Sequence, residues 1–250
     1  MSLAAVLDRG VLTLTLNRPD KRNALNAAMI GALRGELERA ALDSSVRVVA
    51  IRGAGKDFCA GADLDELLAS ATRNPAENEA DARRLGEIFV AMRGLPKPVV
   101  GIVHGRALAG GAGLATACDI LLMAGSAQLG YPEIQRGFVP AMVMTMLRRM
   151  VGERLAFDLV ATGRLVTAEQ AVQMGLASRV VPDADLDAAG EALLAQLAST
   201  SASALALTKR LLYQLDGVSF AGGIALGARV NAVARAHPDF RDAIAAFLGK

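Results

Sequence analysis

The sequence predicts an α/β protein, because strand-like apolar runs alternate with helix-like segments along most of the chain. The runs at residues 46–52 and 99–104 read as strands buried on both sides, which is typical of a sheet covered by helices on its two faces. From about Ser201 onward, the pattern changes to helices with no strand signal among them. We therefore expect a core of residues 1–197 and a C-terminal helical region of residues 198–250.

The N-terminal elements are predicted from turn and capping residues. Two apolar or β-branched runs, at residues 4–7 and 11–16, flank a good turn at residues 8–10 and predict a β-hairpin. Asn26 is a candidate N-cap for an amphipathic helix that continues to about Ala41. The strand at residues 46–52 follows this helix.

The middle of the chain continues the alternation. Asp63 is the expected N-cap of a short helix at residues 64–70, and the polar stretch at residues 72–78 is expected to be a mobile loop. A helix at residues 81–95 should end before Pro96. The remaining elements are a strand at residues 99–104, a helix at 110–117, a strand at 120–123, and helices at 204–215, 220–236 and 240–248.

Charge and composition exclude several classes of protein. The net charge is only +2 with acidic and basic residues interspersed, whereas a nucleic-acid-binding protein normally carries a basic stripe. No stretch reaches the roughly 18 to 20 uninterrupted apolar residues that a membrane span needs. Asp8 and Arg9 interrupt the apolar N-terminus, which is unlike a signal peptide. We expect a cytoplasmic protein with no nucleic-acid or membrane partner.

The few cysteines and histidines argue against disulfide and metal chemistry. Cys59 and Cys118 form no C-x-x-C pair and are expected to be small buried thiols. His104 and His237 lie far apart and lack the spacing of metal ligands. The glycine-rich segments match neither the phosphate-binding loop nor the dinucleotide fingerprint, and no G-x-S-x-G motif is present.

Two segments combine small residues with a change from strand to helix. Residues 57–64 (DFCAGADL) place small residues between a strand end and a helix start, where backbone N–H groups can point into a cleft. Residues 103–113 (VHGRALAGGAG) turn from a strand into a helix whose first N–H groups lack partners within the helix. A tight turn with close helix packing would explain the glycines alone, but it does not explain the presence of both segments.

These two segments resemble the oxyanion-hole motifs of the crotonase family, which comprises enoyl-CoA hydratases and isomerases. They are followed at the usual distance by GYPEI at residues 130–134. Residues 17–26 are similar to the family's N-terminal coenzyme A loop, and residues 163–181 match its later signature. The resemblance covers almost the whole chain in the right order and spacing.

The resemblance implies a fold, a substrate and an assembly. The fold would be the crotonase-like spiral of β-β-α units with a C-terminal helical trimerisation region. The apolar faces of the C-terminal helices are consistent with this, because short helices need another surface against which to bury such faces. The substrate would be an acyl-CoA thioester, with no separate cofactor because coenzyme A is part of the substrate. We expect a homotrimer, or a hexamer built from two trimers.

The resemblance also assigns roles to individual residues. Ala62 and Gly110 fall at the two positions whose backbone N–H groups hold the thioester oxygen, and Glu133 falls at the position of the acid/base. Substrate contacts are implied for Arg22, Ala24, Leu25, Ala60, Asp63, Leu64 and Tyr131. Simpler alternatives remain for three of these residues: a helix cap for Asp63, a packed ring for Tyr131, and a solvated first-turn acid for Glu133.

One departure from the family pattern leaves the reaction open. Hydratases of the family usually carry a second glutamate where this chain has Gly113, and members with one glutamate are typically double-bond isomerases. The glycine pair that commonly follows the proline at position 140 is also missing. We expect an isomerase-like or hydratase-like enzyme, with isomerase-type chemistry slightly ahead. The alternatives are other thioester chemistry, such as decarboxylation or hydrolysis, and a non-catalytic acyl-CoA binding protein.

Several further residues have structural interpretations as well as functional ones. Asp119 belongs to a family motif but is expected to be a buried, hydrogen-bonded structural acid. Arg18, Arg22 and Lys56 are either phosphate contacts or exposed solubilising charges. The methionines at positions 142, 144, 146 and 150 are expected in the core or in a flexible pocket lining.

Overall fold

The computed structural model of the chain describes residues 1–249 and contains two β-sheets within them. The larger sheet consists of β1 (Leu3–Asp8), β2 (Val11–Leu16), β3 (Val48–Gly53), β4 (Val99–Val103), β6 (Ile120–Ala124) and β9 (Arg179–Val181), in that spatial order. The smaller sheet consists of β5 (Arg106–Leu108), β7 (Gln128–Gly130) and β8 (Leu165–Thr167). From β2 to β9 the larger sheet is parallel, as the predicted α/β class requires.

The predicted N-terminal hairpin is confirmed. Strands β1 and β2 are antiparallel, and their register runs from Leu3 opposite Leu16 to Asp8 opposite Val11. The turn places Arg9 and Gly10 at positive φ, a conformation that glycine adopts readily. On β2 the leucines at positions 12, 14 and 16 are buried, because alternate side chains of a strand share one face.

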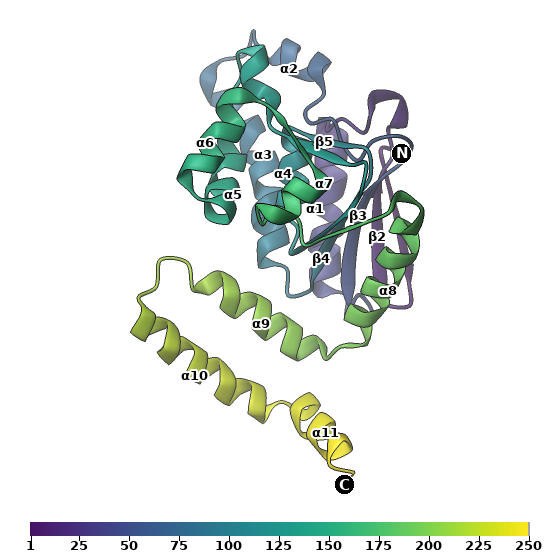
Figure 1. Cartoon of the computed structure of the whole chain (residues 1–250), viewed down its shortest axis with the longest axis vertical. Helices are drawn as coiled ribbons and strands as arrows, with labels where there is room; N and C mark the ends of the chain where they lie inside the picture. Colours follow the sequence, from purple (N-terminus) through teal and green to yellow (C-terminus); the bar gives the residue numbers. More distant parts are fainter. Residues whose placement is uncertain (250) are drawn as a thin grey trace.

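Helices cover both faces of the larger sheet (Figure 1). Helix α1 (Ala27–Leu42) packs on β1, β2 and α3 (Pro75–Gly94), and α8 (Leu186–Ser199) packs on β2, β3, β4 and β6. Every residue of β4 is buried, which confirms the prediction of a strand covered on both sides. The core lies between these layers.

One predicted loop is wrong. Residues 75–78, which we expected within a mobile polar segment at residues 72–78, belong to the first turns of α3, so this helix begins six residues earlier than predicted. The reason is a capping box: the Asn74 side chain accepts a hydrogen bond from the Glu77 backbone N–H at 3.0 Å, and the Glu77 carboxylate accepts one from the Asn74 N–H at 3.0 Å. Pro75 occupies the first helical position, where proline needs no N–H partner.

The other helices connect the strands or follow them. Those before residue 186 are α2 (Leu64–Ser70), α4 (Gly110–Thr116), α5 (Ala141–Val151), α6 (Glu153–Thr162), α7 (Ala168–Gln173) and the 3-10 helices η1 (Pro19–Lys21), η2 (Pro132–Arg136) and η3 (Asp183–Asp185). The predicted caps of α1 and α2 are confirmed, since Asn26 accepts from the Met29 N–H and Asp63 accepts from the Asp65 N–H.

The C-terminal part of the described chain is helical, as predicted. It consists of α9 (Ala202–Gln214), α10 (Phe220–Ala236) and α11 (Pro238–Phe247), with no strand among residues 200–249. In Figure 1, α10 and α11 stand apart from the sheet, and α9 lies between them and the core. No helix in the part of the chain that the structure describes is both long and apolar enough to cross a membrane.

Candidate active site

The loop after β2 is fixed by a buried asparagine. Asn23 is fully buried at a φ of 56°, and its side chain donates hydrogen bonds of 2.8 Å to the backbone oxygens of Ala54 and Asp57. The same side chain accepts a bond from the Arg18 N–H at 2.9 Å. The Cys59 thiol donates to the Asn23 backbone oxygen at 3.1 Å. These contacts hold the loop before α1 against the loop that follows β3.

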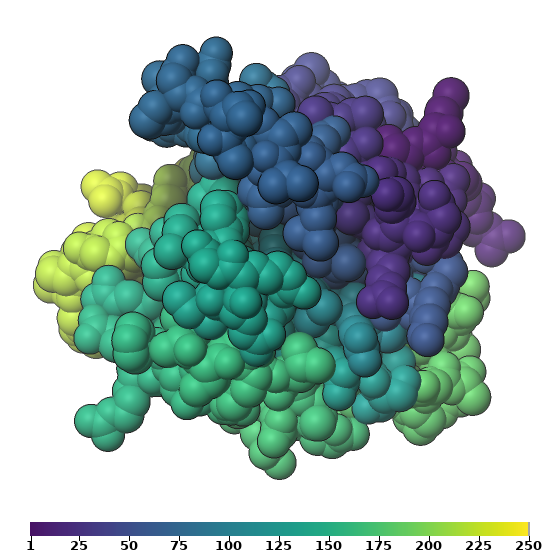
Figure 2. Space-filling model, turned by 90° about the horizontal axis from the view of Figure 1, so that it is seen from above, coloured from purple at the N-terminus to yellow at the C-terminus, as the bar shows by residue number. Residues whose placement is uncertain are grey.

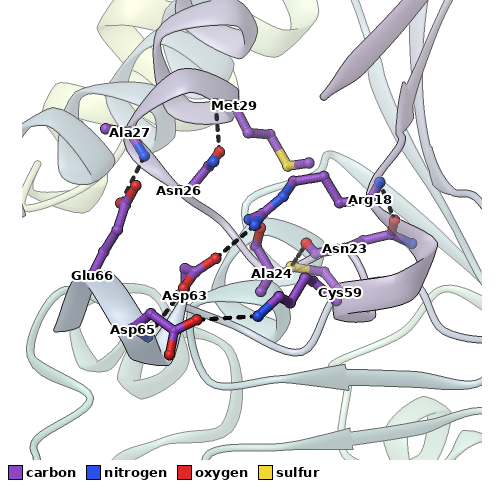
Figure 3. Close-up of polar contacts among 11 residues, drawn as sticks. Arg18, Asn23, Ala24, Asn26, Ala27, Met29, Cys59, Asp63, Asp65 and Glu66 are labelled. Atoms are coloured by element: carbon purple, nitrogen blue, oxygen red, sulfur yellow. Dashed lines mark hydrogen bonds and ion pairs between the residues drawn. The ribbon is translucent and has the colours of Figure 1, made fainter. Parts of the chain in front are cut away.

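A second contact between the same loops is an ion pair (Figure 3). The Arg18 guanidinium lies 2.7 Å from the Asp63 carboxylate and donates a hydrogen bond of 2.8 Å to the Ala24 oxygen. The bond from Arg18 holds the pKa of Asp63 below its usual range, so Asp63 stays charged at the N-terminus of α2. Both side chains therefore have partners within the chain. Asp63 caps α2, as the sequence favoured, and Arg18 holds the loop through Asp63 and the Ala24 oxygen.

The backbone of Ala62 is held by Leu25. The Leu25 N–H donates to the Gly61 oxygen at 2.7 Å, and the Asp63 N–H donates to the Leu25 oxygen at 2.9 Å. Leu25 therefore pairs with the residues on either side of Ala62, and the Ala62 N–H points away from it. This N–H donates no hydrogen bond to any other described residue.

The second glycine-rich segment meets Ala62 at the start of α4. Ala109 links β5 to this helix with a φ of 50° and a ψ of −124°, and its N–H donates to the Gly130 oxygen at 2.8 Å. Gly110 is the first residue of α4, where N–H groups have no partner inside the helix. A Cβ atom placed on Gly110 would lie 3.9 Å from the Ala62 nitrogen. The two loops that the sequence singled out are thus neighbours in space.

Glu133 lies in η2, three residues after the Gly130 that binds Ala109. Its side chain is buried, and its Oε2 atom has no hydrogen-bond partner among the described residues. Burial raises the pKa of Glu133, and a hydrogen bond from its own backbone N–H and the charge of Arg136 only partly oppose this effect. The structure therefore buries a carboxyl group with a raised pKa three residues after the Gly130 oxygen that binds Ala109, where a solvated acid would have been exposed.

The predicted substrate contacts fall into a buried set and an exposed set. Ala24 and Leu25 are buried beside the Ala62 loop, whereas Leu64 and the Arg22 side chain are largely exposed. The Ala60 N–H donates to the Arg22 oxygen at 2.9 Å, so Ala60 is also part of this loop contact. In Figure 2, the purple N-terminal loop, the blue residues of α2 and α3, and the teal residues around η2 border the same face.

Tyr131 has the packed position that the sequence favoured. The ring is fully buried, and the hydroxyl lies 2.8 Å from the Thr116 hydroxyl. Burial raises the pKa of Tyr131 to about 12, so the phenol stays protonated near neutral pH. Its predicted contact with an acyl group remains a prediction.

The cysteines, His104 and the methionines singled out in the sequence lie in the core, on backbone groups or at the surface. Cys59 and Cys118 are buried free thiols, as expected, and burial raises the pKa of Cys59 to about 12. His104 binds the Gly55 oxygen through its ring, and residues 1–249 contain no cluster of three or more metal-binding side chains. The four methionines divide: those at positions 142 and 146 pack against the core, and those at positions 144 and 150 are exposed.

Asp119 is the structural acid that we expected, but its partners were missed. Its carboxylate accepts hydrogen bonds from Lys209 at 2.6 Å, Tyr213 at 2.7 Å and the Val99 N–H at 2.7 Å. Lys209 is 8% exposed and also donates to the Met92 oxygen at 2.7 Å. The sequence offered little signal for this contact, because Lys209 stands next to Arg210 in the predicted helix at residues 204–215 and nothing marks which of the two is buried.

The chain is similar to known proteins over nearly its whole length. The family model described as enoyl-CoA hydratase/isomerase matches residues 7–250. A protein of Thermus thermophilus named for enoyl-CoA hydratase is 40% identical over 96% of this chain and 95% of its own. The 2,3-dehydroadipyl-CoA hydratase of Escherichia coli is 39% identical over 96% of this chain and 92% of its own. A crystal structure of an enoyl-CoA hydratase from Mycobacterium smegmatis has a TM-score of 0.95 and 34% identity, covering 100% of this chain and 96% of that one.

Proposed function

The chain belongs to the enoyl-CoA hydratase/isomerase family, with its crotonase fold, and is an enzyme of that family; from this premise we propose that it acts on an acyl-CoA thioester through an enolate intermediate. The observation that carries the proposal is that the free N–H of Ala62 lies beside the start of α4, whose first residue is Gly110. The buried carboxyl of Glu133, whose Oε2 atom has no partner among the described residues, is the proposed third member of the site. No separate cofactor takes part in the proposed reaction, because coenzyme A arrives with the substrate.

In the proposed mechanism, the backbone N–H groups of Ala62 and Gly110 hold the thioester oxygen. When a proton leaves C2 of the acyl group, negative charge develops on this oxygen, and two fixed amide donors stabilise it without having to reorganise. Loss of one such donor typically costs about 2.7–4 kcal/mol of transition-state stabilisation. The position of Gly110 in the first turn of α4 adds the positive end of the helix dipole.

Glu133 is the proposed proton carrier. As a carboxylate it removes a proton from C2 of a 3-enoyl thioester, and the electron pair of the broken C–H bond moves into the dienolate. The same carboxyl group then returns the proton to C4, so that the double bond lies between C2 and C3 and Glu133 is again a carboxylate. The raised pKa supports this role, because a group that both takes and gives a proton works best with a pKa near the working pH.

The loop residues are the proposed contacts of the coenzyme A part. Arg22 has the exposed cationic side chain that a phosphate needs, and its pair with Asp57 is long, at 3.9 Å, whereas Arg18 is partly buried and pairs with Asp63 at 2.7 Å. Ala24, Leu25 and Ala60 would offer backbone groups, and Leu64 would offer exposed apolar surface. Tyr131 would contact the acyl end only through its ring, since its hydroxyl binds Thr116.

Deuterium exchange tests this function directly. Wild-type protein incubated with a saturated acyl-CoA in heavy water should place deuterium at C2 of the acyl group, because enolate formation requires this proton to leave. Glu133→Gln should slow the exchange by about 10²–10⁴-fold while leaving acyl-CoA affinity nearly unchanged. Glu191→Gln, an exposed glutamate of α8, is the matched control and should exchange at the wild-type rate.

Two results would contradict the proposal. Acyl-CoA binding without exchange in the wild type would remove the enolate step. Equal exchange by wild type and Glu133→Gln would remove Glu133 from the reaction. Assays with malonyl-type and saturated thioesters on the same protein would reveal decarboxylation or hydrolysis in place of double-bond chemistry.

A further inference from the structure

Asp63 places a negative charge one residue after the Ala62 N–H of the proposed oxyanion site. Its side chain is only 7% exposed, so water and salt screen this charge weakly. A hydrogen bond from Arg18 holds the pKa of Asp63 below its usual range, and the group is therefore a carboxylate at neutral pH. In the proposed reaction a second negative charge develops on the thioester oxygen at Ala62. A carboxylate without a counterion would repel that charge.

Arg18 supplies the counterion for this carboxylate. Its guanidinium lies 2.7 Å from Oδ2 of Asp63 and also donates to the Ala24 oxygen at 2.8 Å. The backbone N–H of the same arginine donates to the buried Asn23 side chain at 2.9 Å. Because contacts at both ends hold this residue, its charge is in place before a substrate binds, and no reorganisation is needed when the enolate forms.

The other two acids in the first turn of α2 contact the same region of the chain at the surface (Figure 3). The Asp65 carboxylate lies 3.1 Å from the Lys21 ammonium, and both side chains are exposed. The exposed Glu66 carboxylate accepts a hydrogen bond from the Ala27 N–H at 2.9 Å. Exposed contacts of this kind are worth little, because solvent screens them. The ion pair made by the N-cap of α2 is therefore the least screened of these contacts.

Building on the function proposed above, we propose that Arg18 is a positioning residue of the oxyanion site: it neutralises the Asp63 carboxylate, so that the enolate charge can develop at the Ala62 N–H without repulsion. Arg18 acts through Asp63; it touches no reacting atom and moves no proton. The effect belongs to the transition state, because the thioester oxygen takes on its negative charge only as the C2 proton leaves. Loss of the arginine charge should therefore slow enolate formation much more than it weakens acyl-CoA binding.

Single substitutions measure this effect through deuterium exchange at C2 of a saturated acyl-CoA, at a saturating concentration in heavy water. Arg18→Met removes the charge and keeps an unbranched side chain; it should slow exchange at least about tenfold and raise the Kd for the acyl-CoA less than about threefold. Asp63→Asn removes the carboxylate and keeps an oxygen that can cap α2, so it should slow exchange less than about threefold. Arg34→Met is the matched control, because Arg34 forms an exposed ion pair with Glu87 of α3, and it should exchange at the wild-type rate.

The decisive variant combines Arg18→Met with Asp63→Asn. If the arginine acts by neutralising the carboxylate, removing both charges should restore exchange to at least about fivefold above the rate of Arg18→Met alone. A purely structural role of the pair predicts the opposite, because the double variant then loses the same contact and gains nothing. Arg18→Gln, which can still donate a hydrogen bond to Asp63 but carries no charge, replaces Arg18→Met in both comparisons if the latter does not fold.

The two levels of the hypothesis fail in different ways. Loss of less than tenfold in Arg18→Met, a loss that appears in the Kd instead of the exchange rate, or a double variant no faster than Arg18→Met overturns the role of Arg18. In each of these cases exchange by the wild type, and its loss in Glu133→Gln, still support the enolate. A wild type that binds acyl-CoA without C2 exchange overturns the proposed function, and this inference with it.

Discussion

At the scale of single residues, Glu133 carries a carboxyl group that the fold buries without a partner for its Oε2 atom. Burial raises its pKa in the folded protein, so the folded state binds its proton more tightly than the unfolded state does. Wild-type stability is therefore complete below the unfolded carboxyl pKa of about 4.3 and declines as the pH rises through the raised folded value.

Glu133→Gln should stabilise the protein at pH 8, because glutamine carries no charge that must be buried. We expect a gain of roughly 1 kcal/mol in the free energy of unfolding, or about 2–4 °C in Tm for a chain of this size. The gain should disappear at pH 4, where the wild-type carboxyl is protonated. Thermal unfolding of both proteins from pH 4 to pH 8 measures this; a constant difference across that range would show that Glu133 does not titrate abnormally.

Ala109 has a strained backbone, since its φ of 50° and ψ of −124° suit glycine and not alanine. Ala109→Gly should raise the free energy of unfolding by about 1 kcal/mol, as the relief of strain exceeds the entropy that glycine adds to the unfolded chain. Ala107→Gly, in the buried and unstrained β5, should lower it by a similar amount. Urea unfolding of the two variants should therefore show shifts of opposite sign.

Local sequence signals predicted some of these residues and not others. The caps Asn26 and Asp63 were predictable because a cap binds backbone groups only two or three residues away. The pairing of Arg18 with Asp63 was not, because it joins residues 45 positions apart and neither residue marks the contact. The backbone strain at Ala109 was hidden for a different reason, since alanine is not the residue that a positive φ normally selects.

At the scale of elements, helix α9 is attached to the core through a buried ion pair. Lys209 reaches Asp119, which follows α4 and precedes β6, and Tyr213 of the same helix binds the other carboxylate oxygen. Burial lowers the pKa of Lys209, and the charge of Asp119 opposes this effect. Breaking a buried pair by removing one partner is costly because the remaining charge is left uncompensated.

Asp119→Asn should therefore destabilise the protein by roughly 3 kcal/mol and increase amide hydrogen exchange in α9 more than in β4. Asp216→Asn, which removes an exposed partner of Arg93 and Arg149, is the matched control and should change stability by less than about 1 kcal/mol. Equal effects of the two substitutions in urea unfolding would mean that the Lys209 pair does not anchor α9.

The sequence predicted elements better than contacts between elements. Continuous apolar runs revealed β4, and periodicity revealed α10 with its bounds unchanged. The start of α3 was missed because the charged residues after Pro75 give no apolar stripe, while the Asn74 capping box lies outside any periodic pattern. The close packing of Val143 against Gly113 could not be predicted at all, because it depends on how α5 packs on α4.

At the scale of the whole molecule, the C-terminal helices leave much apolar surface uncovered. On α10, Phe220 is 86% exposed and Ile224 is 62% exposed, and on α11 Phe247 is 87% exposed. Short helices with such faces are stable when they bury them against another surface. The fold of the core was predictable from the alternation of strands and helices, whereas the assembly could be inferred only from the family resemblance and remains a proposal.

We propose that copies of the chain cover these faces in a homotrimer, or in a hexamer built from two trimers. Sedimentation equilibrium should then give three or six times the chain mass of 25.9 kDa. Phe220→Asp combined with Ile224→Asp should shift the protein to the monomer mass, since each substitution places a charge in a face that association would bury. Leu68→Asp is the matched control, because Leu68 is 77% exposed on α2, far from α10 in Figure 1, and it should leave the mass unchanged. A wild-type protein that sediments as a monomer at micromolar concentration would show that the exposed faces of α10 and α11 do not mediate self-association.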